Sequence, residues 1–310
     1  MIAPSVLLTT SKILILDPPE TAAADLARTC TVKWRNGKLW VSYARTPSMR
    51  LPALSNTVWL RSCLNRSSVQ AVFLDPNLRE SEIKLWADAC HQAGKPVFLK
   101  LPSAAGLPQR VKGVSWVLKR TVDWLAAALL LVLLSPLLLL IALLIRLTSN
   151  DPILFQQWRV GERGKLFRIT KFRTMVANAE NLHHQVMGSQ NGLHKRVDDP
   201  RVTPIGRWLR KYSLDELPQL FNVLHGEMSL VGPRPWALYD AVRITGESQR
   251  RLNALPGITG AWQVQARSTL LDLEAVNQLD LTYLESWSIQ KDLKLLLLTI
   301  PKVISGFGAF

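Results

Sequence analysis

The chain has 310 residues, 48% of them apolar and 20% charged, so it can form two ordinary domains and is neither a disordered chain nor a collagen-like fibre. Its 38 Lys and Arg against 23 Asp and Glu give a net charge of +15, which predicts an anionic partner such as nucleic acid, a membrane surface or phosphorylated substrates. Its 3 cysteines form no C-x-x-C pair, which indicates neither a disulfide framework nor a zinc site and favours a reducing, cytoplasmic setting.

Residues 1–112 are predicted to form a small soluble α/β domain with a parallel sheet. Strands are expected at 12–18 (KILILDP), 69–76 (VQAVFLDP) and 95–102 (KPVFLKLP). A helix is predicted at 83–94, where apolar residues recur at helical spacing before a glycine that can end it. The domain contains no Gly-rich phosphate loop, so a packing or regulatory role is the default expectation.

Residues 113–146 are predicted to be a linker followed by a membrane segment. From Trp124 to Ile145 the chain carries no charge, and as a helix this stretch would be ~33 Å long, enough to cross a bilayer. It begins beyond residue 120, so it is not a cleaved signal peptide.

The middle of the apolar segment holds Ser135 and Pro136. Pro136 lacks a backbone N–H and crowds the carbonyl of Val132, which predicts a kink, and the hydroxyl of Ser135 is placed to bond a freed carbonyl. Both flanks are basic, so the positive-inside rule does not favour placing the two ends on opposite sides. A re-entrant hairpin satisfies both observations, and one straight span is equally compatible with these features alone.

Residues 147–310 are predicted to form a mostly helical domain that carries the chemistry. Between Arg159 and Lys211 there are 12 Lys and Arg against 4 Asp and Glu, so an anionic ligand is expected here. Lys171 and Arg173 alternate with apolar residues as on a strand, so their side chains are expected to share one face.

Asp215 and Glu216 are predicted to stand at a helix N-terminus. Asp215 suits the N-cap, Pro218 the first turn, and an apolar face follows until Gly226 ends the helix. Free N–H groups and the helix dipole favour an anion there, and a carboxylate beside a bound phosphate can act as a nucleophile or a metal ligand. The alternative is that Asp215 only caps the helix and Glu216 only stabilises its first turn.

Two arginines flank this acidic pair in the sequence. Arg210 lies five residues before Asp215, and Arg234 stands between Pro233 and Pro235, whose rings restrict the backbone and can fix one guanidinium direction. A rigid arginine suits bidentate recognition of phosphate. Taken singly, each is also compatible with an ordinary surface charge.

The C-terminal run 292–307 is apolar only over short stretches and contains Lys294, Pro301 and Lys302. Its length and charges predict an amphipathic helix lying in a membrane interface, in preference to a second span.

Residues 116–310 resemble the bacterial sugar transferases, the monotopic phosphoglycosyl transferases that move a sugar 1-phosphate from a UDP-sugar onto a polyprenyl phosphate. The matching motifs occur in the expected order: the basic approach and Asp123, the apolar segment with Ser135 and Pro136, QQWRVGERGKLF (156–167), KFRTM (171–175), the long run 198–235, PGITGAWQV (256–264) and the C-terminal run 279–303.

The resemblance implies a role for the acidic pair and its neighbours. Asp215 is expected to be the nucleophile, Glu216 to bind Mg²⁺, and Arg210 with the loop Pro233, Arg234 and Pro235 to receive phosphate or nucleotide. Lys171 and Arg173 are expected in the same phosphate-binding set, and Ser135 with Pro136 to make a re-entrant hairpin.

The expected reaction is a two-step transfer through an aspartyl phospho-sugar at the cytoplasmic face of the bacterial inner membrane, which initiates the assembly of an exopolysaccharide or another surface glycan. The expected partners are a UDP-sugar, polyprenyl phosphate and membrane lipid, with a homo-oligomer possible and nucleic acid not expected. Two other classes stay open: a nucleic-acid binder, although the basic stretch holds few aromatic residues, and a membrane-tethered non-catalytic scaffold or regulator of glycan assembly.

Overall fold

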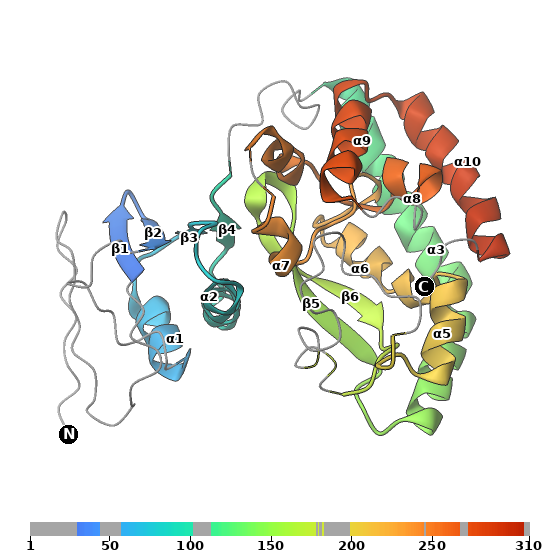
Figure 1. Cartoon of the computed structure of the whole chain (residues 1–310), viewed down its shortest axis with the longest axis horizontal. Coiled ribbons are helices and arrows are strands. Elements are labelled where there is room, and N and C mark those ends of the chain that lie inside the picture. The colour runs from blue at the N-terminus through green and yellow to red at the C-terminus, as the bar shows by residue number, and fades with distance from the viewer. Residues whose placement is uncertain are drawn as a thin grey trace. The chain divides into compact units, whose positions relative to one another are not determined.

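The computed structural model describes residues 30–43, 57–101, 113–177, 179, 182, 199–244, 246–266 and 272–306. The chain divides into two compact units, one made of residues 1–101 with Gly164–Leu166 and the other of the remaining residues (Figure 1). The predicted domain boundary at residue 112 adjoins the segment 102–112, which lies outside the described residues. The two units are described separately below.

The first unit contains a four-stranded sheet of order β1-β2-β3-β4 and two helices. Strands β3 and β4 and helix α2 confirm the elements predicted at 69–76, 95–102 and 83–94. The strand predicted at 12–18 lies outside the described residues. The elements are β1 (Cys30–Arg35), β2 (Lys38–Tyr43), α1 (Thr57–Arg66), β3 (Ala71–Leu74), α2 (Glu80–Gln92) and β4 (Val97–Leu99).

The prediction of a parallel sheet is wrong for one of the three strand pairs. β2 pairs with β3 and β3 with β4 in parallel, but β1 pairs with β2 in an antiparallel hairpin. The turn of this hairpin is Asn36-Gly37, whose φ angles of 50° and 71° are both positive. A two-residue turn with positive φ at both positions matches the right-handed twist of the strands, and Asn-Gly is its strongest sequence signal. The Asn-Gly pair is therefore a local sequence signal for this hairpin, which was not among the predicted elements.

One face of this sheet is buried under the helices and the other carries an aromatic row. Alternate residues along the strands, such as Val41, Val72 and Leu99, are buried, as the period-2 geometry of strands requires. On the opposite face Trp40, Phe73 and Phe98 stack across neighbouring strands, with ring centroids 4.5 and 5.0 Å apart.

The second unit is organised around one long helix, α3 (Val114–Thr148), together with shorter helices and two small sheets. The remaining elements used below are β5 (Leu154–Val160), β6 (Leu166–Phe172), α5 (Pro204–Lys211), α6 (Gln219–Leu224), β7 (Ser229–Val231), β8 (Gly257–Thr259), α8 (Ala261–Gln265), α9 (Leu273–Glu285) and α10 (Ile289–Ser305). β5 and β6 form one two-stranded sheet, and β7 and β8 pair in parallel to form the other.

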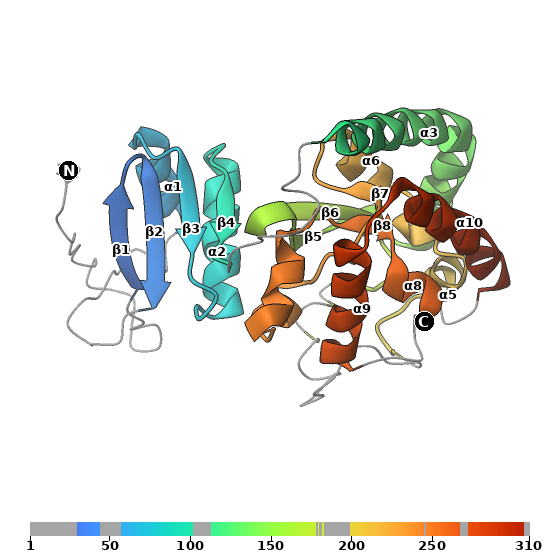
Figure 2. The ribbon, with the colours of Figure 1, turned by 90° about the horizontal axis from the view of Figure 1, so that it is seen from above.

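Helix α3 contains the predicted apolar segment and continues through Pro136. The Oγ of Ser135 donates a hydrogen bond of 2.8 Å to the carbonyl of Val132, the group that Pro136 cannot serve, and this confirms the local prediction. Figure 2 shows that the helix changes direction: its first part runs along the top of the unit and its paler end turns downward. In the described part of the chain, α3 is the one helix long and apolar enough to cross a membrane.

Both limbs of α3 pack on the same unit. Before Pro136, Ala127 is buried in a cluster with Leu220 of α6 and Met228. After Pro136, Ile141 and Ile145 are buried in a second cluster with residues of β6 and α5. The two ends of the apolar segment are therefore both fixed to one folded body.

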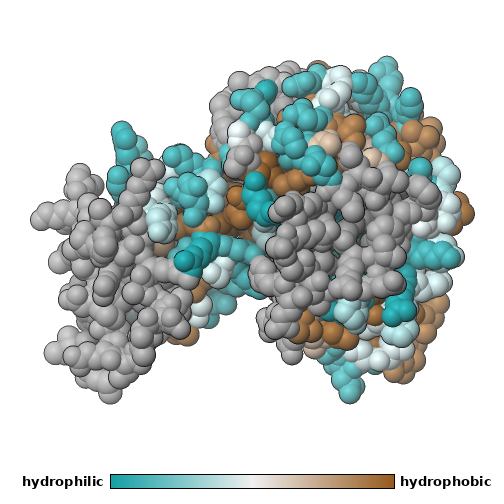
Figure 3. All heavy atoms as spheres, in the orientation of Figure 1, coloured by the Kyte–Doolittle hydropathy of each residue, from teal (hydrophilic) through white to brown (hydrophobic). Residues whose placement is uncertain are grey.

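Helix α10 is amphipathic, as predicted for 292–307. Its inward face buries Leu295, whereas Leu293, Leu297 and Ile304 are 57%, 60% and 72% exposed. Figure 3 shows hydrophobic atoms on the right-hand side of the molecule, where α10 and the end of α3 lie in Figure 1. This apolar surface is of the kind that marks an interaction site.

Helix α5 lies directly against the backbone of Thr174. A Cβ added to Gly206 would lie 2.1 Å from the carbonyl oxygen and 2.8 Å from the Cα of Thr174, so only glycine allows this approach. The contact also places Arg210 of α5 so that its Nε donates to the Thr174 hydroxyl at 2.9 Å.

We expect Gly206→Ala to lower the free energy of unfolding by about 2 kcal/mol, because the new methyl group must push α5 away from backbone atoms. Gly113→Ala is the matched control, since an added Cβ there meets no atom within 4 Å. Thermal unfolding followed by tryptophan fluorescence compares the two variants. Equal midpoints for both would contradict the close approach of α5.

Candidate active site

A cavity of about 1030 Å³ in the second unit brings most of the predicted site residues together. Its polar part is lined by six of them: Lys171, Arg173, Arg210, Asp215, Glu216 and Arg234. Its apolar part is lined by side chains of two helices, including Leu130 and Leu134 of α3 and Leu297, Ile300 and Ile304 of α10. Pro235 lines a smaller adjoining pocket, and Pro233, Ser135 and Pro136 line neither of these two.

The turn that carries Asp215 differs from the predicted helix start. Asp215 is not an N-cap but lies inside a 3₁₀ turn, Leu214–Glu216, and α6 begins only after Pro218. Ser213 precedes this turn with φ +53°, in the left-handed region that a non-glycine residue rarely occupies. Such strained positions persist where the surrounding structure enforces them, often at active sites.

Two backbone amides at this turn are engaged within it. The N–H of Glu216 donates to the Ser213 carbonyl at 3.2 Å, and that of Leu217 to the Leu214 carbonyl at 3.3 Å. Side-chain cations supply further positive charge beside this turn. The predicted apolar face is also only partly buried, since Leu220 is 3% exposed but Phe221 is 47% exposed.

Glu216 is held by two cations. The Nζ of Lys171 donates to its Oε1 at 2.6 Å, and a guanidinium nitrogen of Arg234 lies 3.4 Å from the same atom. Arg210 approaches from α5, and Arg173 donates from its Nε to the Pro152 carbonyl at 2.7 Å. Cations from β6, α5 and the loop after β7 thus converge on the acidic pair.

The loop that carries Arg234 is fixed through all three of its carbonyls. The carbonyl of Pro233 accepts a hydrogen bond from the N–H of Gly257 at 2.9 Å, that of Arg234 accepts one from Arg251 at 2.7 Å, and that of Pro235 accepts one from Arg159 at 3.1 Å.

Arg251 is in turn buried against Asp280 of α9 at 2.5 Å and lies over the ring of Trp236. No local pattern in the sequence separates Arg159, Arg251 and Asp280 from ordinary charged residues, so their supporting roles were not predicted.

Asp215 is almost completely buried, at 9% exposed, and no hydrogen bond to its carboxylate is found within the described residues. Burial is the main cause that raises its pKa, to about 6. Lys171 opposes this rise, the neighbouring charge of Glu216 adds to it, and Arg210 and Arg234 oppose it further. At neutral pH the group is mostly ionised, poorly solvated and surrounded by cations, which is a suitable state for a nucleophile that attacks phosphate.

Glu216 is the residue of this site that could hold a metal ion together with a substrate, although its Oε1 is paired with Lys171 and Arg234. Mg²⁺ is commonly held by one or two carboxylates together with substrate phosphates. Glu216 supplies a carboxylate at the cavity wall, next to Asp215. Among the described residues there is no group of three or more His, Cys, Asp or Glu that could enclose a metal.

Comparison with known proteins agrees with the resemblance described above. A family model of bacterial sugar transferases matches residues 114–306, and the chain therefore belongs to the bacterial sugar transferase family. The matched region begins at α3 and includes the whole cavity. The resemblance drawn from the motifs is confirmed.

Three relatives illustrate the range of similarity. The chain is 42% identical to the undecaprenyl-phosphate glucose phosphotransferase of Komagataeibacter xylinus over 241 residues, which are 73% of this chain and 43% of that protein. It is 45% identical over 200 residues to the UDP-glucose:undecaprenyl-phosphate glucose-1-phosphate transferase of Caulobacter vibrioides (62% and 72%). It is 35% identical over 234 residues to the exopolysaccharide production protein ExoY of Rhizobium meliloti (72% and 99%). The chain thus spans less than half of some curated relatives, at 36% and 43% of their length, and nearly all of others.

The raised pKa of Asp215 predicts how Asp215→Asn changes stability with pH. Between the ordinary carboxyl pKa and about 6 the folded protein binds more protons than the unfolded chain, so this group makes the folded state less stable as pH rises through that window. Asparagine does not titrate. The unfolding temperature of the variant should therefore rise relative to that of the wild type from pH 4 to pH 6.5, and the difference should be constant at higher pH. The difference in the free energy of unfolding should change by at most about 1.4 kcal/mol for each pH unit. A difference that does not change with pH would contradict the raised pKa.

Proposed function

We propose that this chain transfers a sugar 1-phosphate from a UDP-sugar to polyprenyl phosphate and releases UMP. The observation that carries the proposal is the buried carboxylate of Asp215 among Lys171, Arg210 and Arg234, in a cavity that continues between the apolar side chains of α3 and α10. A reaction between a charged nucleotide and a lipid phosphate needs a cationic region and an apolar region in one site. The names of the relatives above include UDP-glucose and undecaprenyl phosphate, which supports this choice of substrates.

The reaction is proposed to have two steps. In the first, an oxygen of the Asp215 carboxylate bonds to the phosphorus that carries the sugar, and the bond from that phosphorus to the bridging diphosphate oxygen breaks, so UMP leaves with the bonding electrons. In the second, an oxygen of the lipid phosphate bonds to the same phosphorus and the bond to Asp215 breaks. The sugar keeps its own bond to the phosphate oxygen throughout, so the product is a lipid diphosphate sugar.

Electrostatic attraction is the main contribution of the chain's own residues. In each step an anion attacks a phosphate, so positive charge that is already in position lowers the barrier. Arg234 is fixed by its loop and can bond two phosphate oxygens at once, while Lys171 and Arg210 contribute from β6 and α5. Glu216 would hold Mg²⁺, which when bound neutralises charge on the diphosphate of the donor.

The proposed location is the cytoplasmic face of the inner membrane, with α3 as a re-entrant hairpin. Three observations support this: Pro136 interrupts the apolar run, the helix changes direction, and both limbs pack on one unit. A straight span would carry one end of the apolar run away from this unit. The exposed leucines of α10 then suit contact with the lipid interface.

Donor alone should modify the enzyme. Purified protein incubated with UDP-glucose and Mg²⁺, without lipid, is expected to gain the mass of a hexose phosphoryl group on the peptide that contains Asp215, and Asp215→Asn is expected to gain none. Intact and peptide mass spectrometry measures both. Glu247→Gln, a carboxylate change at an exposed residue, is the matched control and should behave as the wild type. Active wild-type enzyme that is never modified would overturn the covalent mechanism.

Cysteine labelling tests the topology. With Cys30, Cys63 and Cys90 replaced by alanine, single cysteines are placed at Val117 and Leu147, which flank the apolar run and are 62% and 74% exposed. Both should react with a membrane-impermeant maleimide only after the inner membrane is opened. Reaction of just one of them in intact spheroplasts would indicate a span.

A further inference from the structure

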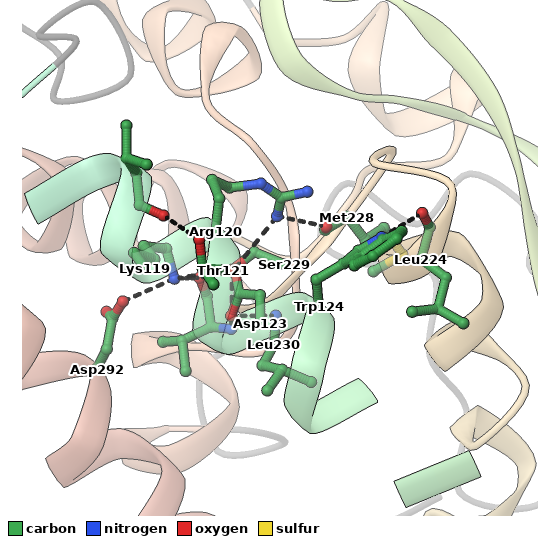
Figure 4. Close-up of polar contacts among 12 residues, drawn as sticks. Lys119, Arg120, Thr121, Asp123, Trp124, Leu224, Met228, Ser229, Leu230 and Asp292 are labelled. Carbon is green, nitrogen blue, oxygen red and sulfur yellow. Dashed lines mark hydrogen bonds and ion pairs between the residues drawn. The ribbon is translucent and has the colours of Figure 1, made fainter. Parts of the chain in front are cut away.

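The strand that leads into the Arg234 loop is bonded to the first limb of the membrane helix. Asp123 of α3 accepts hydrogen bonds from the Ser229 hydroxyl at 2.6 Å and from the Leu230 N–H at 3.3 Å (Figure 4). The Nζ of Lys119 donates to the Val231 carbonyl at 3.1 Å, one helical turn earlier. Arg234 follows Val231 by only three residues.

The same lysine joins α3 to α10. The Nζ of Lys119 lies 2.7 Å from Asp292 Oδ2, and Asp292 also accepts hydrogen bonds from the Tyr283 hydroxyl at 2.6 Å and the Trp287 Nε1 at 3.1 Å. The side chains of Lys119, Asp123 and Asp292 are only 6%, 6% and 10% exposed. One buried ammonium group therefore connects α3, β7 and α10.

This cluster balances its charges. Arg120 adds a second cation, lying 3.2 Å from Asp123 and donating to the Met228 carbonyl at 3.0 Å, so two cations face two carboxylates. A buried network of this kind is weak evidence for added stability, because desolvation offsets much of the attraction. Its best supported use is to specify one register.

Helix α3 needs such a specification. Its apolar run is leucine-rich on every side, and apolar contacts are non-directional, so rotation or sliding of the helix would replace one leucine by another. The bonds from Lys119 and Asp123 are directional and end on particular atoms of β7. They fix the rotation and depth of α3 relative to the strand that carries the phosphate loop.

We propose that Lys119, Asp123 and Asp292 are positioning residues that set Arg234 for the donor phosphate by locking β7 between the membrane helix and α10. The kinetic test of this inference rests on the proposed function, whereas the test by hydrogen exchange does not. In this proposal the start of α3 contributes to nucleotide binding, although none of the three residues lines the cavity.

The kinetic test is a double-mutant cycle with Arg234. Lys119→Met/Asp292→Asn removes one charge of each sign, so no unpaired buried charge remains. When Arg234 is present, this double variant should lower kcat/KM for UDP-glucose at least tenfold, mostly by raising KM. In an Arg234→Gln background the same double variant should lower kcat/KM less than twofold, because the side chain that it positions is absent. The ion pair of Glu247, which is 81% exposed, with Arg250 provides the control: Glu247→Gln/Arg250→Met should have no effect in either background. Equal effects in both backgrounds would overturn the positioning role.

The structural test does not need activity. Amide hydrogen exchange measured by mass spectrometry should be at least tenfold faster in 229–235 of the double variant and unchanged in α6. Unchanged exchange in 229–235 would overturn the positioning role. A wild-type enzyme that transfers no sugar would overturn the proposed function, but the exchange measurement would still test the positioning role. If the double variant does not fold, Ser229→Ala removes one bond to Asp123 and should give the same pattern at smaller amplitude.

Discussion

The structure depends on the cost of burying one ionised carboxylate. Asp215 is removed from water without a hydrogen bond from any described residue, and its pKa rises although three cations face it. A carboxylate kept ionised in this way is destabilised relative to its solvated state. In the proposed reaction, forming a bond to phosphorus relieves part of this cost. Ser213, in the left-handed region, precedes the turn that carries Asp215, and the neighbouring helix α5 packs closely on Thr174.

Each cation around Asp215 is positioned by a different contact, and these contacts come from distant parts of the chain. Lys171 is aligned by Glu216, Arg210 by the Thr174 hydroxyl, and Arg234 by the hydrogen bonds that its loop receives. The supports of the Arg234 loop come from Arg251 in the segment 246–253, from β5 and from β8, and β7 itself is attached to α3. Under the proposed function, binding of a diphosphate thus draws on several distant elements of the second unit.

Local patterns in the sequence predicted β3, β4, α2 and the Ser135 bond, because each is set by neighbouring residues. The grouping of Lys171, Arg210 and Arg234 with the acidic pair came from the family resemblance, because these residues come from distant parts of the chain. The same patterns failed where tertiary contacts decide. Asp215 reads as an N-cap, yet packing bends its segment into a 3₁₀ turn. Arg251 reads as a surface charge, and only its contact with Asp280, 29 residues away, makes it a buried support. The Asn36-Gly37 hairpin was a readable signal that went unused.

The bend of α3 has a consequence for the lipid around it. In the proposed topology, a hairpin whose limbs return to one body adds volume to a single leaflet and leaves the opposite monolayer nearly undisturbed. The area of the two monolayers then differs wherever these molecules gather. Regions of a cell membrane that bend toward the crowded side would accommodate such molecules at lower elastic cost than flat ones.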